Sequence, residues 1–175
     1  MTMRNHTSER AGDASPLAAG TSDALTILTH DHTDVAELFE AYDGLVESEG
    51  GDDEKQALAE RICALLTAHA TIEEEIFYPA AREALDAHKL LDEAEVEHAT
   101  AKDLIEQIQS MDPGDELYDA KVKVLGEYVN HHVQEEEGEL FPLCQGADMD
   151  LDELGEELTA RREELMEELG LDAEE

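Results

Sequence analysis

The chain has 175 residues, of which 41% are hydrophobic and 33% charged, and its formal net charge is −36. The hydrophobic share is too high for a chain that is disordered throughout, and the lack of any basic patch excludes a nucleic-acid-binding protein. Because acidic residues are spread along every segment, the charge predicts a protein from a halophile with a salt-rich cytoplasm, rather than a nucleic-acid mimic or a calcium buffer.

The first predicted helix follows a flexible N-terminal lead, residues 1–20, which is rich in Gly, Ser and Thr and has no helical periodicity. Thr21, Ser22 and Asp23 form a typical N-cap sequence. The helix is predicted to run from there to the Gly-rich turn near 48–51. Its apolar residues recur at helical spacing, at Leu25, Leu28, Val35, Phe39, Tyr42 and Val46.

Three further long helices are predicted. The second begins at Asp52 or Asp53 and is broken or kinked near Pro79, the third spans about 89–110, and the fourth follows a turn at 112–114. The apolar positions again recur at helical spacing. They are Leu58, Ile62, Leu65, Leu66, Ile76 and Phe77 in the second helix, Leu91, Ala94, Ala101, Ile105 and Ile108 in the third, and Leu117, Val124, Leu125, Tyr128 and Leu140 in the fourth.

A fifth, strongly acidic helix is predicted within residues 148–170. Its apolar positions are Leu151, Leu154, Leu158, Leu165 and Leu169. Long helices joined by short turns pack as antiparallel neighbours. The pattern therefore predicts an all-α fold, an up-down-up-down four-helix bundle over residues 21–147 with an additional C-terminal amphipathic helix within residues 148–175.

Each of the four bundle helices places a histidine on its apolar stripe, and two of them add a glutamate one turn later. Burying a carboxylate costs several kcal/mol unless a positive charge accompanies it, so the group predicts a metal site in the bundle core. The candidate ligands are His32, His69, Glu73, His98, His132 and Glu136.

The same short sequence occurs twice, as HATIEEEIFYP from His69 to Pro79 and as HVQEEEGELFP from His132 to Pro142. A single histidine followed four residues later by glutamate is weak evidence in so acidic a chain. Two copies in one shared pattern indicate two similar helical hairpins that supply matching halves of one site. Four imidazoles and two carboxylates without a thiolate favour a pair of iron ions over structural zinc, with open positions for oxygen, nitric oxide or peroxide.

These motifs resemble the hemerythrin-like, HHE cation-binding family over about residues 22–145. The resemblance implies a non-haem di-iron site, oxo- or hydroxo-bridged, with Glu73 and Glu136 bridging the two ions. Lys102 stands where oxygen-carrying relatives have a fifth histidine, four residues after His98. The resemblance is therefore closer to members linked to nitric-oxide or oxidative stress and to iron handling.

Three functions follow as hypotheses. The leading one is a di-iron module that binds or responds to a small ligand or handles iron; the others are a catalase-like or nitric-oxide-reducing enzyme, and an interaction module whose C-terminal helix binds a protein partner or a second copy. A ferritin-like site is a weaker rival, because its E-x-x-H motif occurs once, at Glu95 and His98.

Other polar residues near the candidate ligands receive separate expectations. His131 is an alternative ligand to His132, while His30 is expected at the surface. Asp31 and Glu97 are expected to be solvated rather than to orient a ligand. Two further residues flank the site: Tyr128 is expected to pack in the core, and Lys102 to point outward.

Two cysteines, Cys63 and Cys144, lie far apart in the chain, which predicts buried or idle thiols in a reducing cytosol. No stretch approaches the roughly 18 consecutive apolar residues of a membrane helix, and the N-terminus lacks the apolar segment of a signal peptide. We therefore expect a cytoplasmic protein with no membrane partner.

Overall fold

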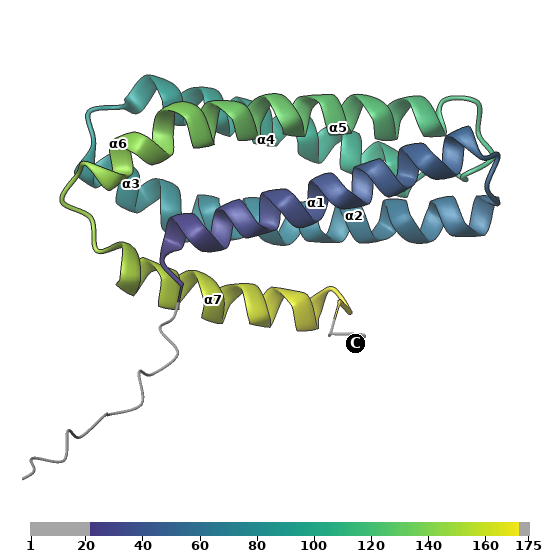
Figure 1. The fold of residues 1–175 in the computed structure, drawn as a ribbon. Coiled ribbons are helices and arrows are strands. Elements are labelled where there is room, and N and C mark those ends of the chain that lie inside the picture. The colour runs from purple at the N-terminus through teal and green to yellow at the C-terminus, as the bar shows by residue number, and fades with distance from the viewer. Residues whose placement is uncertain (1–21, 172–175) are drawn as a thin grey trace, which may run out of the picture.

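The computed structural model describes residues 22–171, and every regular element within that range is helical (Figure 1). The predicted four-helix bundle is confirmed: it consists of α1 (Ala24–Glu47), α2 (Asp52–Ile72), α4 (His88–Gln109) and α5 (Tyr118–Glu135). Each bundle helix packs against two others, α1 on α2 and α5, and α4 on α2 and α5. The predicted lead 1–20, Thr21 and the last four residues lie outside the described range.

The second helix was predicted to be broken or kinked near Pro79, and the structure shows an interruption of the regular α-helix just before the proline, in this helix and in the fourth. Each passes through one π-helical turn, η1 (Glu73–Phe77) or η2 (Glu136–Leu140), and then continues as α3 (Tyr78–Ala84) or α6 (Phe141–Gln145). The N–H groups of Tyr78 and Phe141 donate to the carbonyls of Glu73 and Glu136, five residues back. The wider turn accommodates a proline that has no N–H to donate and whose ring would clash with an α-helical turn.

The predicted C-terminal helix is α7 (Leu151–Glu168), which lies outside the bundle against α1 and α2 (Figure 1). Leu158 and Leu165 are buried on its inner face. At Gly155 the helix approaches the chain just before α1 so closely that a Cβ would lie 2.3 Å from the carbonyl oxygen of Ser22. The apolar face of α7 is therefore occupied by the bundle itself.

Two apolar clusters fill the bundle on either side of a buried polar layer. The predicted stripe of α5 was partly wrong, because Leu117, Val124 and Tyr128 are 58%, 39% and 45% exposed. The buried residues of α5 are Tyr118, Val122, Leu125 and His132, of which Leu125 and His132 were predicted and Tyr118 and Val122 were not.

Other apolar expectations hold in part. Val46 and Leu169, at the ends of their helices, are exposed.

Cys63 and Cys144 are buried free thiols, and burial raises their pKa values to about 12 and about 11. No helix within residues 22–171 is long and apolar enough to cross a membrane.

Candidate metal centre

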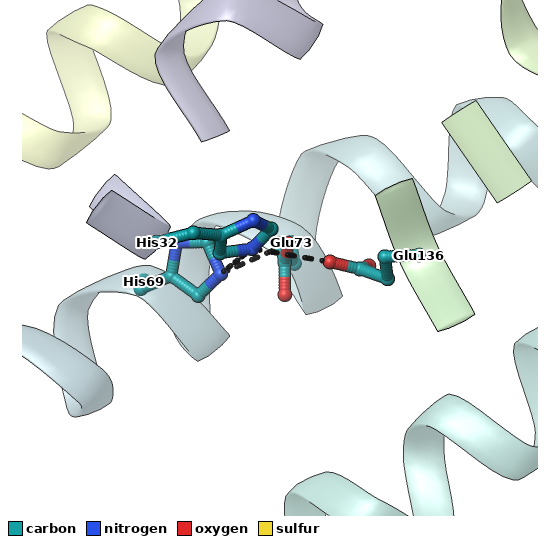
Figure 2. Close-up of side chains that lie close together, drawn as sticks. All are labelled: His32, His69, Glu73 and Glu136. Atoms are coloured by element: carbon teal, nitrogen blue, oxygen red, sulfur yellow. Dashed lines mark hydrogen bonds and ion pairs between the residues drawn. The ribbon is translucent and has the colours of Figure 1, made fainter. Parts of the chain in front are cut away.

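The six residues predicted as metal ligands lie together in the buried polar layer between the two apolar clusters. One half of the group joins α1, α2 and the two π-helical turns (Figure 2). The Nε2 atoms of His32 and His69 are 3.1 Å apart. Glu73 Oε1 lies 3.1 Å from His69 Nε2, and Glu136 Oε2 lies 3.3 Å from His32 Nε2. These four donor atoms all lie within 4.8 Å of one another, close enough to share a metal ion.

The second half repeats this arrangement with the histidines of α4 and α5. The Nε2 atoms of His98 and His132 are 3.2 Å apart, and His98 Nε2 lies 3.2 Å from Glu73 Oε2. Glu73 therefore directs one oxygen to each half. Glu136 Oε2 lies between the halves as well, 3.3 Å from His32 Nε2 and 3.5 Å from His132 Nε2.

Each of the four histidines also pairs its outer ring nitrogen, Nδ1, with a different carboxylate. The pairs are His32 with Glu137 at 2.8 Å, His69 with Asp31 at 3.4 Å, His98 with Glu74 at 2.9 Å, and His132 with Glu97 at 2.6 Å. An ionised carboxylate only accepts hydrogen bonds, so each Nδ1 donates. When such a ring is neutral, its Nε2 lone pair faces the centre, which is the arrangement usual for histidines that bind metal ions.

The expectation that Asp31 and Glu97 are solvated was therefore wrong. Each precedes the first histidine of its hairpin and accepts from the second histidine of the same hairpin. Glu74 and Glu137, which the sequence marked only as part of the repeated pattern, cross over to the first histidine of the other hairpin. The sequence does contain a signal for these four carboxylates: in both copies of the repeat, each is the direct neighbour of a candidate ligand.

Two buried carboxylate oxygens, Glu73 Oε1 and Glu136 Oε2, have no hydrogen-bond partner within residues 22–171. Burial would lower the pKa of His69, but the carboxylates of Glu73 and Asp31 raise it well above its usual value. Burial would likewise raise the pKa of Glu73, but His69 and His98 hold it well below. The centre therefore favours positive charge, and its imidazole and carboxylate donors fit metal cations.

The hydroxyl of Tyr78 enters the centre from the start of α3, a contribution that the sequence did not predict. It donates to Glu136 Oε1 at 2.7 Å and lies 3.2 Å from both Glu73 Oε2 and His98 Nε2. Burial, followed by the charges of Glu73 and Glu136, raises the pKa of Tyr78 well above its usual value, so the hydroxyl keeps its proton.

A cavity of about 40 Å³ adjoins the four histidines. Its other walls are mostly apolar and include Val35, Leu66, Ile105 and Val129. Because a single water needs roughly 10–15 Å³ measured in this way, the cavity has room for a diatomic molecule or peroxide. Apolar walls favour such ligands over ions.

Two residues that line this cavity differ from their expected roles. Tyr128 is 45% exposed rather than packed in the core. Lys102 is half exposed but does not simply point outward, because its Nζ lies 2.6 Å from Glu74 Oε2. Glu74 also holds His98, so Lys102 belongs to the network around the centre.

The remaining alternatives find no place in the centre. His131 is largely exposed and faces Glu97 and Glu135, so His132 is the histidine that faces the other candidate ligands. His30 is exposed as expected and pairs with Asp34. The glutamate required by the ferritin-like alternative, Glu95, is exposed and pairs with Arg82.

Comparison with known proteins agrees with this geometry. The sequence profile of the hemerythrin HHE cation binding domain matches residues 23–144. A crystal structure of a hemerythrin HHE cation binding domain-containing protein from Mycobacterium kansasii superposes with a TM-score of 0.69 at 25% identity, covering 84% of this chain and 89% of that one. A curated protein named DNA nickase, from Nostoc sp., is 38% identical over 79 residues, which span 43% of this chain but only 21% of that protein.

Proposed function

Because this chain belongs to the hemerythrin HHE cation-binding domain family, we propose that it binds two non-haem iron ions and uses them to bind, or respond to, a small ligand such as oxygen, nitric oxide or peroxide. The observation that carries the proposal is the pair of buried carboxylate oxygens without a hydrogen-bond donor, set among four inward-facing imidazole nitrogens. The proposed ligands are His32, His69, Glu73, His98, His132 and Glu136.

The division of donors supports two ions rather than one. Each half offers two imidazoles, and Glu73 directs a separate oxygen to each half. We propose that Glu73 and Glu136 bridge the ions. Imidazole with carboxylate and no thiolate suits iron, and a donor set with free positions differs from the closed tetrahedron of structural zinc.

The surroundings support binding of a small molecule. Bound iron would supply a redox change and a coordination position for the ligand. The chain contributes an apolar cavity of about 40 Å³ beside the histidines, four carboxylates that fix the imidazole orientation, and the protonated hydroxyl of Tyr78. Such a cavity has room for a small molecule and none for a bulky one.

A catalase-like enzyme is the second candidate, and Tyr78 is the observation that favours it. Two peroxide molecules disproportionate to two waters and one oxygen, so the reaction needs no outside electron donor, whereas reduction of nitric oxide needs one. The Tyr78 hydroxyl, 2.7 Å from Glu136 Oε1, keeps its proton and supplies a hydrogen-bond donor inside the centre that can stabilise charge on a peroxide oxygen.

Other assignments carry less support. The relative named DNA nickase shares only a fifth of its length with this chain, and the charge of −36 would repel a nucleic-acid backbone. We therefore propose no nucleic-acid substrate. A cytoplasmic location in a salt-rich cell remains our proposal, and a partner docking on α7 would have to use its outer face.

The test is metal analysis of the purified protein together with its absorption spectrum. We expect two irons per chain and oxo-bridge bands that respond to oxygen, nitric oxide or peroxide. His69→Ala and His132→Ala should lower the iron content well below two, whereas His131→Ala, one residue away and exposed, should leave it unchanged. Folded protein that takes up no iron, or unchanged iron in both ligand variants, would refute the proposal.

A further inference from the structure

Helix α7 lies beyond residues 23–144, which match the family profile, yet it reaches the metal centre through Arg162. Two nitrogens of its guanidinium contact the same oxygen, Oδ1 of Asp31: Nε donates a hydrogen bond to it at 2.9 Å, and Nη2 lies 2.8 Å from it. Asp31 is only 7% exposed. This two-point contact joins the added helix to a buried carboxylate of α1.

Asp31 divides its two oxygens between the helix and the centre. Oδ1 takes Arg162, and Oδ2 lies 3.4 Å from Nδ1 of His69. His69 in turn places its Nε2 toward His32 and Glu73. A continuous chain of polar contacts therefore runs from α7 through Asp31 to one proposed iron ligand.

The other half of the centre is supported differently: its cation is Lys102 of α4, which pairs with Glu74 beside His98, and no arginine of the described chain pairs with the carboxylate beside His132. The equivalent carboxylate, Glu97, accepts from His132 Nδ1 at 2.6 Å, a shorter contact than the 3.4 Å between Asp31 and His69. The second oxygen of Glu97 lies 3.6 Å from exposed His131 rather than next to an arginine. The two halves thus have matching ligands but different outer support.

The position of Arg162 is fixed by the packing of α7. Leu158 and Leu165, on either side of Arg162, are buried against the bundle, and the close approach at Gly155 leaves no space between the helix and the chain near Ser22. The neighbouring Arg161 points elsewhere, pairing with Glu75 at 2.8 Å and Glu164 at 3.0 Å.

We propose that Arg162 is a positioning residue: α7 uses it to hold Asp31 against His69, and so controls how strongly the His32–His69 half of the centre retains its metal ion. The proposal rests on the metal-binding function above. According to this proposal, α7 contributes to metal binding, and the two ion positions differ in affinity although their ligands are of the same types.

The experiment titrates metal-free protein with Fe²⁺ under anaerobic conditions in a calorimeter. Wild type should bind two ions, and His69→Ala identifies the step that belongs to the His32–His69 half. Arg162→Gln should weaken that step by about 10–100-fold, the usual effect of losing a residue that orients a metal ligand, and leave the other step unchanged. Arg162→Lys should recover part of the loss, while Arg161→Gln, the matched control, should bind as wild type does.

A double-variant comparison tests whether Arg162 acts through Asp31. Asp31→Asn combined with Arg162→Gln should bind no more weakly than Asp31→Asn alone, because both changes break one chain of contacts. Additive losses, equal weakening of both steps, or the same loss in Arg161→Gln would overturn the inference. Wild type that binds no Fe²⁺ would instead refute the proposed function, so the two failures are distinguishable.

Discussion

Tyr78 and Phe141 follow the two π-helical turns at equivalent positions, but only Tyr78 brings a hydroxyl into the metal centre. The Tyr78 hydroxyl lies 2.7 Å from Glu136 Oε1. The Phe141 ring instead stacks on His32, with ring centroids 6.0 Å apart and an interplanar angle of 8°. One half of the centre therefore adjoins a hydroxyl donor, and the other adjoins an apolar ring.

Replacing Tyr78 by phenylalanine should destabilise the metal-free protein. The change would remove the donor to Glu136 Oε1, while Glu136 Oε2 already has no hydrogen-bond partner in the described part of the chain. Loss of a hydrogen bond to a buried charged group costs about 1.5–3 kcal/mol. For a chain of this size that corresponds to a fall in Tm of about 3–12 °C, measurable by circular dichroism in the presence of a chelator.

The control for this change is Tyr118→Phe. Tyr118 is also buried, but it belongs to the apolar cluster at the other side of the polar layer. Removal of its hydroxyl tests the general effect of the substitution without touching the metal centre. Equal Tm values for Tyr78→Phe and wild type, or equal losses in the two variants, would contradict the assigned role of the Tyr78 hydroxyl.

The carboxylates around the histidines should matter for metal retention although we do not propose them as ligands. Glu97→Ala removes the acceptor 2.6 Å from His132 Nδ1, which frees the imidazole to rotate or change tautomer. We expect about 10–100-fold weaker metal binding, measured by competition with a chromophoric chelator. Glu95→Ala removes an exposed carboxylate from the same helix, paired with Arg82, and should have no effect. Similar affinities for the two variants would contradict the orienting role.

The sequence predicted the bundle well because its signal is periodic. Buried positions such as Leu28, Ile62 and Leu91 lie on stripes that local spacing defines. The error on α5 arose where apolar residues occur in adjacent positions. Val124 and Leu125 are neighbours, and only packing against the other helices decides that Leu125 is the buried one. The π-helical turns were missed because proline signals an interruption without specifying its form.

The six candidate ligands could also be predicted from the sequence, because a histidine or glutamate at a position where the helical spacing requires an apolar residue is conspicuous. The sequence did not identify the residues around them. Tyr78 and Arg162 reach the centre from turns and helices whose placement depends on tertiary packing. Asp31 and Glu97 look like solvated acids in so acidic a chain, and only the partner helix shows that each faces an imidazole.

Acid should weaken a second polar contact, remote from the metal centre, between Asp119, Lys55 and Tyr42. Burial would raise the pKa of Asp119, but hydrogen bonds from Lys55 Nζ and the Tyr42 hydroxyl hold it below its usual value. A lowered pKa in the folded state stabilises the protein above the unfolded pKa of about 3.9. That stability is lost as pH falls below this value.

Asp119→Asn should therefore lower the free energy of unfolding at neutral pH, and the gap from wild type should close as pH falls toward about 3. The side chain of Asp119 is 38% exposed, so we expect a gap of at most about 1 kcal/mol, measured by urea unfolding across a pH series. Asp43→Asn, which breaks the more exposed pair with Lys123, should have a smaller effect. If the difference in the free energy of unfolding between wild type and Asp119→Asn grew as pH fell, the pKa of Asp119 would be raised and not lowered by folding.

Salt should stabilise the fold, because a net charge of −36 on 175 residues leaves strong repulsion among surface carboxylates. The Debye length falls from about 10 Å at 0.1 M salt to about 3 Å at 1 M, so most of that repulsion is screened within this range. We therefore expect Tm to rise between 0.1 and 2 M KCl, by about 2–4 °C for each kcal/mol gained in a chain of this size. Screening should level off above about 1 M, whereas stabilisation by solute exclusion, for which sucrose is the control, should continue to rise with concentration. A Tm that is independent of KCl would mean that the paired cations of the surface, and not salt, offset the acidic charge, and would remove the physical basis for a halophilic origin.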